Sequence, residues 1–333
     1  TVHACPGRSS PGVPTCVPAG FGAAPRPREV CPWMFRSLGP WRPCLPCGRL
    51  DRGTRAARLA TLVVALILQA IHRTRAVDID ASEGKLYWAN YGENKIQRAS
   101  LVDGSDVEDV IVDGVDGPWG VALHEPSCRL FWSDTGTMSI RQAHLDGSDV
   151  VLFLTLGNGA SDAPTALFVD SEGGKLYWVQ QDSRVGRAGL FGDGSDAEEL
   201  QPGYNDDRHS IAVDYGGGFL YWADTAQFRL QRAPLDAGSI PTTWIDDFND
   251  IYVPQRIALH KQSGGLLWTD NGFGQIRRAD LDTAVVEVIV EDLSFPIALA
   301  IDGSGQMLFW TEQGSVSEIQ RGDLHSSGVA LGW

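Results

Sequence analysis

The chain has 333 residues, and its formal net charge of −15 is distributed very unevenly. Residues 1–75 contain 11 Arg and no Lys against two acids, whereas the remaining 258 residues contain 16 basic and 40 acidic groups, a net charge of −24. So acidic a segment repels phosphate, which argues against nucleic acid or an anionic membrane as its partner and favours cations and basic surfaces.

Residues 1–57 are rich in Pro, Arg and Gly and show no hydrophobic period, which predicts a disordered extension. The chain begins with Thr1 and its first methionine is Met34, so part of this extension is compatible with sequence outside the native coding region. Its five cysteines include one Cys-x-x-Cys pair without a second pair at zinc-site spacing, a weak sign of a metal or redox site: Cys5, Cys16, Cys31, Cys44 and Cys47.

Residues 58–75 contain an apolar run of thirteen residues, Leu59 to Ile71. That length suits the core of a signal peptide and falls short of a transmembrane span, which favours export and an extracellular or membrane-associated location. Arg73 and Arg75 at the expected cleavage region, and the lack of any Asn-x-Ser/Thr site in the chain, weigh against this interpretation. Three possibilities stay open for 59–71: a cleaved signal, a membrane tether, or a segment that packs on the following domain or closes it.

From residue 76 onward the sequence repeats six times. A tryptophan recurs at intervals of 42 to 46 residues: Trp88, Trp132, Trp178, Trp222, Trp268 and Trp310. A period in the forties is typical of a repeat architecture. Cys128 is the one cysteine of this region and has no partner within it, so no disulfide is expected to support its fold.

The surrounding positions keep the same register. Two positions after the tryptophan four repeats have an acid: Asp134, Asp224, Asp270 and Glu312. Eight positions before it stands a short polar residue: Asp80, His124, Asp170, Asp214, His260 or Asp302. Fourteen positions before it four repeats have proline: Pro118, Pro164, Pro254 and Pro296.

Each unit divides into four short β-strands. The first ends at the short polar residue, a glycine-containing turn follows, and the second contains the tryptophan, with apolar side chains on both of its faces. An Arg-Ala-x-Leu segment and a further apolar run supply the third and fourth strands. The predicted fold class is therefore all-β: residues 76–333 form a six-bladed β-propeller of four-stranded blades.

These motifs resemble the YWTD repeats, also called class B repeats, of the low-density lipoprotein receptor family, over all six units. The departures are Asn90 and Gln180 at the acidic position and Arg208 at a proline position. The resemblance implies that the motif acids accept amide hydrogen bonds that tie one blade to the next. It also implies flanking cysteine-rich modules, although no cysteine follows Cys128.

The recurring side chains are expected to have structural roles. The six tryptophans and the four motif acids are expected to form the packed core of the repeat. The ring of Asp and His residues is expected to anchor the turn into the second strand, with a metal in the central channel as the alternative. The sequence contains no catalytic or nucleotide-binding motif, so we expect no enzymatic activity and no cofactor; the alternative is a calcium-dependent six-bladed-propeller hydrolase.

The remaining hypothesis is a receptor-type ligand-binding module, acting as a single propeller. The loops from strand four to the next strand one, and from strand two to strand three, emerge on one face of a propeller. In this chain they collect aromatic and acidic residues: Tyr91, Glu93, Asp116, Trp119, Tyr204, Asp206, Asp207, Phe228, Asp250, Tyr252 and Phe273. Aromatic anchors within a charged rim predict a protein or peptide ligand, basic or amide-bearing, with Trp119 and Tyr252 as anchors.

Overall fold

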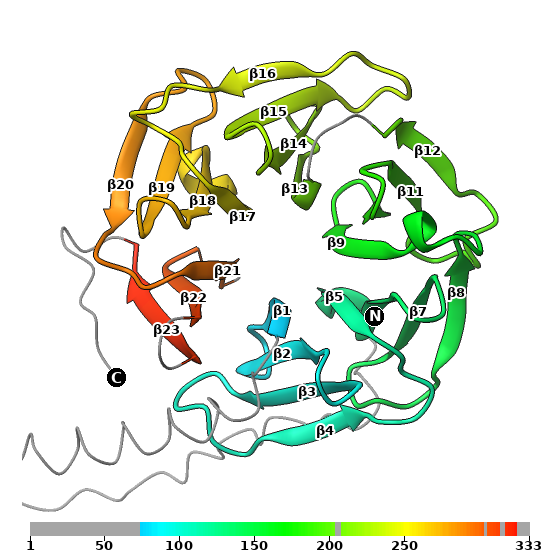
Figure 1. Cartoon of the computed structure of the whole chain (residues 1–333). Coiled ribbons are helices and arrows are strands. Elements are labelled where there is room, and N and C mark those ends of the chain that lie inside the picture. Colours follow the sequence, from blue (N-terminus) through cyan, green and yellow to red (C-terminus); the bar gives the residue numbers. More distant parts are fainter. Residues whose placement is uncertain (1–73, 204–207, 303–304, 314–316, 325–333) are drawn as a thin grey trace, which may run out of the picture.

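The computed structural model describes residues 74–203, 208–302, 305–313 and 317–324. They form a ring of six antiparallel sheets, the blades, in each of which the strands follow one another in chain order from the centre to the rim (Figure 1). The all-β fold and the six-bladed propeller predicted from the sequence are confirmed. The extension 1–57 and the apolar run 59–71 lie outside the described residues.

The first three blades have four strands each. Blade 1 contains β1 (Thr74–Asp80), β2 (Lys85–Asn90), β3 (Lys95–Ser100) and β4 (Glu108–Ile111). Blade 2 contains β5 (Pro118–His124), β6 (Arg129–Asp134), β7 (Ser139–His144) and β8 (Val151–Thr155). Blade 3 contains β9 (Pro164–Asp170), β10 (Lys175–Gln180), β11 (Val185–Gly189) and β12 (Glu198–Gln201).

Blades 4 and 5 repeat this plan. Blade 4 contains β13 (Arg208–Asp214), β14 (Phe219–Asp224), β15 (Arg229–Pro234) and β16 (Thr242–Ile245). Blade 5 contains β17 (Pro254–His260), β18 (Gly265–Asp270), β19 (Gln275–Asp280) and β20 (Val286–Val290). In blade 6 the described residues form three strands: β21 (Pro296–Ile301), β22 (Met307–Gln313) and β23 (Ser317–Asp323).

Helical structure in the described part of the chain is limited to single turns: η1 (Glu125–Ser127), η2 (Ala160–Asp162) and η3 (Lys261–Ser263). None of these described helices is long and apolar enough to cross a membrane. Four of the six innermost strands begin with proline, which suits a strand start because the residue has no N–H to donate.

The repeated tryptophans pack between the blades. All six are buried, and five of them have no measurable exposure: Trp88, Trp132, Trp222, Trp268 and Trp310. The second strand buries both faces as expected: Trp88 packs in a cluster shared with blade 6, and Tyr87 in a cluster shared with blade 2. Each blade therefore buries its core only against its neighbours, and the contact of blade 6 with blade 1 closes the ring.

The residue after the tryptophan supplies a hydrogen-bond acceptor where the innermost strand leaves the regular pairing of the sheet. In blades 2, 5 and 6 the pairing shifts near the start of that strand. The N–H group there donates to a hydroxyl from the second strand, as Gly120 does to Ser133 Oγ at 2.6 Å. Ser133 Oγ in turn donates to the Thr165 carbonyl of blade 3 at 2.9 Å. The same side chain thus satisfies its own sheet and binds the next one.

Cys128 corrects one expectation, because it is disulfide-bonded in the structure. It is the one cysteine among the described residues, since the other five all precede residue 74. No disulfide therefore joins two of the described blades to each other.

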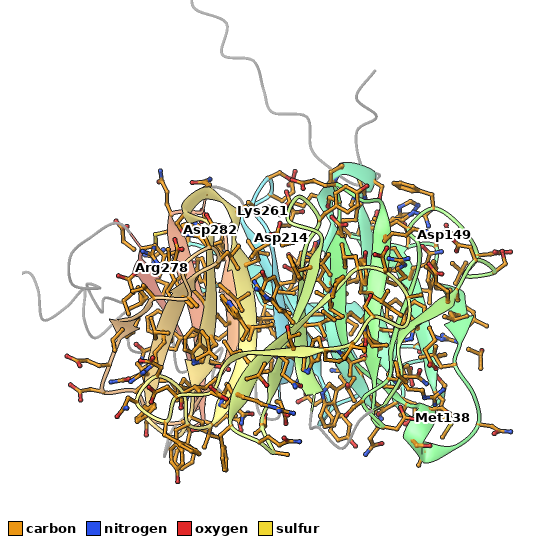
Figure 2. The ribbon with its side chains drawn as sticks, turned by 90° about the horizontal axis from the view of Figure 1, so that it is seen from above. Met138, Asp149, Asp214, Lys261, Arg278 and Asp282 are labelled. Carbon is orange, nitrogen blue, oxygen red and sulfur yellow. The ribbon has the colours of Figure 1, made fainter. Side chains whose placement is uncertain are left out.

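Alternating strand direction gives the ring two distinct faces. We call face A the side that carries the turns from strand two to strand three and the connections from strand four to the next blade. Face B carries the turns from strand one to strand two and from strand three to strand four. Figure 2 shows the ring edge-on, with Met138 on face A at one edge and Asp214, Lys261 and Asp282 on face B at the other.

Candidate functional site

Eight of the residues predicted to bind a ligand are described, and all eight lie on face A: Tyr91, Glu93, Asp116, Trp119, Phe228, Asp250, Tyr252 and Phe273. Tyr204, Asp206 and Asp207 lie outside the described residues. Trp119 is placed differently from the prediction, which assigned it to a connecting loop. It is the second residue of β5, at the end of the strand that reaches face A.

The first aromatic cluster joins blades 1 and 2. The rings of Tyr91 and Trp119 meet edge to face, with centroids 5.8 Å apart and planes at 84°, and both side chains are half-buried. Gly117 lies beside this pair with φ +68°, and a Cβ there would lie 2.6 Å from Thr135 Oγ1, which is closer than a side chain tolerates. The pair therefore occupies a fixed position on the face.

The second aromatic cluster joins blades 4 and 5 and is larger. Tyr252 lies between two phenylalanines, with its ring centroid 5.5 Å from that of Phe228 and 5.9 Å from that of Phe273. The Arg277 guanidinium lies 4.3 Å from the Phe273 ring centroid and donates to the Asn249 carbonyl at 2.9 Å. Tyr252 is 46% exposed and Phe273 37%, so both rings present area to solvent.

The two clusters lie on opposite sides of the ring. Blades 1 and 2 meet across the centre from the contact between blades 4 and 5 (Figure 1). Trp119 and Tyr252, the two predicted anchors, therefore do not form one patch. A single ligand that engages both must cross the mouth of the central channel.

A buried carboxylate fixes the loops of the second cluster. Asp270 Oδ2 accepts the N–H of Tyr252 at 2.9 Å, and Oδ1 accepts that of Val253 at 3.0 Å. Oδ1 also accepts the N–H groups of Gly272 and Phe273. Asp270 has no exposed surface, and the connection that enters blade 5 is thereby held against the turn that carries Phe273.

Two of the other three motif acids, Asp134 and Glu312, make similar contacts. Asp134 Oδ2 accepts the Asp116 N–H at 2.9 Å, and Glu312 Oε2 accepts the Ser294 N–H at 2.6 Å. Each bond links the incoming connection to the blade that it enters, which is the role that the family resemblance implied.

Two phenylalanines on face A adopt left-handed backbone conformations. Phe228 has φ +54° at a turn position that is also left-handed in three other blades, at Asn94, Met138 and Gly274. Phe295 has φ +56° at the position of Gly117 in blade 2. Such a conformation costs a residue with a side chain roughly 1–2 kcal/mol. Phe295 combines this conformation with an exposed ring, which suggests a functional constraint at that position.

The sequence analysis missed two exposed rings of this face. Phe295 is 59% exposed and Phe248 is 66% exposed, and both belong to connections from strand four to the next blade. The sequence contains a signal for both, because they lie in the same kind of connection as Tyr252, between strand four and the next blade. With them, exposed aromatic rings extend from blade 4 to the start of blade 6.

The acids of face A differ in availability. Asp116 and Glu93 are exposed, and Asp250 is half-buried. Glu93 forms an ion pair with Lys95, with 3.4 Å between Oε2 and Nζ. Exposed pairs of this kind contribute at most about 1 kcal/mol, so Glu93 remains accessible to a cationic ligand.

The ring of short polar residues anchors turns on face B. Asp80 Oδ1 accepts the Glu83 N–H at 3.1 Å, and Asp214 Oδ1 accepts the Gly217 N–H at 3.0 Å. His124 Nδ1 and His260 Nδ1 each pair with a serine hydroxyl three residues later, at 2.6 Å. Within the described part of the chain no group of three or more His, Cys, Asp and Glu side chains is placed to hold a metal ion.

The centre of the ring contains a cavity of about 570 Å³. Most of the residues that line it are apolar residues of the innermost strands, such as Val77, Val121 and Ile257, while polar atoms supply about half of its lining surface. Asp78 and Glu125 are the carboxylates of its described lining.

Sequence comparison relates the chain to receptor-related proteins. It is 28% identical over 249 residues to a "Low-density lipoprotein receptor-related protein 1" from Pyricularia oryzae, covering 63% of this chain and 80% of that protein. It is 32% identical over 216 residues to a human "Low-density lipoprotein receptor-related protein 5-like protein", with the same coverage. No protein-family model matches the chain.

Structural comparison gives the same fold. A chain of a nidogen/laminin complex superimposes with a TM-score of 0.60 at 20% identity, covering 74% of this chain and 91% of that one. A gluconolactonase from Xanthomonas campestris superimposes with a TM-score of 0.59 at 16% identity, covering 74% and 84%. At these identities the similarity extends to the propeller fold alone.

Proposed function

Because the chain belongs to the low-density lipoprotein receptor-related family, we propose that its propeller is a non-enzymatic, receptor-type module that binds a protein or peptide on face A. The observation that carries this proposal is the pair of aromatic clusters, Tyr91 with Trp119 and Phe228 with Tyr252 and Phe273. Rigid, partly exposed rings supply most of the affinity at many protein interfaces.

The ligand is an extended segment that crosses the channel mouth from one cluster to the other. Its polar groups are basic or amide-bearing, because Glu93, Asp116 and Asp250 border the rings and residues 76–333 carry a large negative net charge. The charge steers the encounter, while the rings provide the contact area. Binding therefore weakens as the salt concentration rises.

The family relationship supports a place in the secretory pathway, extracellular or membrane-associated, since the relatives are named as receptor-related proteins. The solved complex of nidogen with laminin gives an example of this fold in a protein that has a protein partner. We assign the module to residues 76–333 and propose that it acts as a monomer.

The calcium-dependent hydrolase has less support. It requires several carboxylate or amide groups that converge on the channel, whereas most residues of the described wall are apolar and the short polar residues are engaged in turns. The gluconolactonase shares the fold at 16% identity, which transfers no activity.

The test is a peptide-display selection against the full chain, followed by affinity measurements on the selected peptides. Trp119→Ala with Tyr252→Ala removes one ring from each cluster. Phe191→Ala with Tyr215→Ala is the matched control, because these two aromatic residues are 69% and 52% exposed and lie on face B.

We expect the face A double variant to lose about tenfold or more in affinity and the face B variant to retain it. Undiminished affinity in a folded face A variant would place the site elsewhere. If no peptide is selected from a library that includes basic and amide-rich sequences, the proposal of a peptide ligand is wrong.

A further inference from the structure

The central cavity opens on face B, away from the aromatic clusters. Its lining runs from the third residues of the innermost strands, such as Ala76 and Arg256, to residues just beyond the strand ends, Glu125, Ser171 and Lys261. Those last three belong to turns of face B. A volume of about 570 Å³ lies within the range of small-molecule sites, roughly 300–1,000 Å³.

One side chain of the wall departs from the repeat. Asp78 pairs with Tyr87 in the register between the first two strands of blade 1. The equivalent positions of four other blades hold alanine, Ala122, Ala212, Ala258 and Ala300, and blade 3 holds Phe168. Packing of the ring therefore does not require a carboxyl group at this position.

The Asp78 carboxylate is partly satisfied by backbone. Oδ1 accepts the Ile79 N–H and Oδ2 accepts the Leu123 N–H of blade 2, both at 2.8 Å. An ionised carboxylate offers about four acceptor positions, so roughly two remain for a ligand. The side chain is half-buried and lines the central cavity.

We propose that this cavity binds a small organic ammonium ion, whose apolar body lies against the wall and whose protonated amine binds the Asp78 carboxylate. The apolar residues of the wall bury the apolar body of the ligand. The carboxylate accepts a charge-assisted hydrogen bond from the ammonium group, which a neutral alcohol or hydrocarbon of the same shape does not offer. This site is independent of the peptide proposed for face A.

The other charged groups near the cavity direct the amine toward Asp78. Arg256 lines the end nearer face A, and Lys261 lines the mouth, where its Nζ lies 3.0 Å from Glu172 Oε1. Glu125 and Asp80 raise the negative potential near Asp78.

The site predicts a dependence on pH. Burial, followed by the charges of Glu125 and Asp80, raises the pKa of Asp78 from 3.8 to about 6 against the lowering effect of its two backbone hydrogen bonds. An aliphatic amine stays protonated throughout this range. The carboxylate is ionised at pH 7.5 and neutral at pH 5, so affinity for the ammonium ion falls as the pH falls through about 6.

The experiment titrates the full chain with 2-phenylethylamine by calorimetry at pH 7.5 and pH 5, with 2-phenylethanol as the neutral analogue. Asp78→Ala introduces the residue of four other blades, and Asp78→Asn keeps the shape of the side chain without its charge. Glu199→Gln removes one charge from an exposed position on β12 and is the control for the overall negative field.

We expect the wild-type protein to bind the amine saturably at pH 7.5. The affinity for the alcohol, and the affinity of both Asp78 variants for the amine, should be about tenfold or more lower, whereas Glu199→Gln should bind the amine as the wild type does. Three results overturn the proposal: no binding of the amine at millimolar concentration, equal binding by Asp78→Asn, or an equal loss in Glu199→Gln. Should Asp78→Ala fail to fold, the comparison rests on Asp78→Asn and on the wild-type pH dependence.

Discussion

The buried tryptophans allow a test of how the blades are held together, because some of their indole N–H groups have a hydrogen-bond acceptor and others have none. Trp222 Nε1 donates to Gln231 Oε1 at 3.0 Å, whereas Trp268 Nε1 has no hydrogen-bond partner. The residue opposite on the third strand explains the difference: it is Gln231 for Trp222 and Arg277 for Trp268. Both rings are fully buried, so replacing either by phenylalanine removes the same atoms.

Trp222→Phe and Trp268→Phe therefore share the cost of lost volume and differ in the polar group left behind. The first leaves Gln231 Oε1 without its donor, and the second removes a donor that was already unsatisfied. We expect Trp222→Phe to lower the free energy of unfolding by about 1–3 kcal/mol more than Trp268→Phe. At about 2–4 °C per kcal/mol for a domain near this size, calorimetry or circular dichroism resolves the difference as a shift in melting midpoint.

A third variant separates the hydrogen bond from the packing. In Trp222→Phe combined with Gln231→Met both polar partners are gone, so most of the extra loss should be recovered. Equal destabilisation by the two phenylalanine variants, or no recovery in the double variant, would show that the hydrogen bond contributes nothing and that the two sites differ only in packing.

Two further predictions concern the same framework. Gly186→Ala would place a Cβ against the Trp178 ring, too close for both to stay where they are, and should lower the free energy of unfolding by about 1–3 kcal/mol in chemical denaturation. Gly216→Ala, whose Cβ would have its nearest contact at 3.7 Å, should have a much smaller effect, and equal effects of the two variants would contradict the geometry. Asp270→Ala removes a buried carboxylate that accepts four partly buried N–H groups, and it should lower the free energy of unfolding by about 1–3 kcal/mol. It should also weaken peptide binding on face A. An Asp270→Ala protein with unchanged melting midpoint would show that the carboxylate does not tie the blades together.

The spacing of the tryptophans was sufficient to predict the propeller, because one strand position must bury a large ring in every blade. The alternation of antiparallel strands then placed Tyr91, Phe228 and Phe273 on one face without coordinates. The sequence could not show that Tyr252 lies between two phenylalanines, because that contact joins residues of different blades. It could not mark Phe295 either, since a positive φ at a phenylalanine has no local signature.

The departures from the repeat are the most informative positions in this chain. A propeller constrains equivalent positions of its six blades to similar residues, because each blade packs on its neighbours in the same way. Asp78 in place of alanine puts a carboxylate in the wall of the central cavity, and Phe295 adopts a backbone conformation that Gly117 adopts in blade 2. Asp78 also accepts the Leu123 N–H of blade 2, and both residues add a group that can contact a ligand. Positions where one blade departs from the local rule are where function is expected. On that reasoning we propose two recognition sites, a peptide surface on face A and a small-molecule cavity that opens on face B.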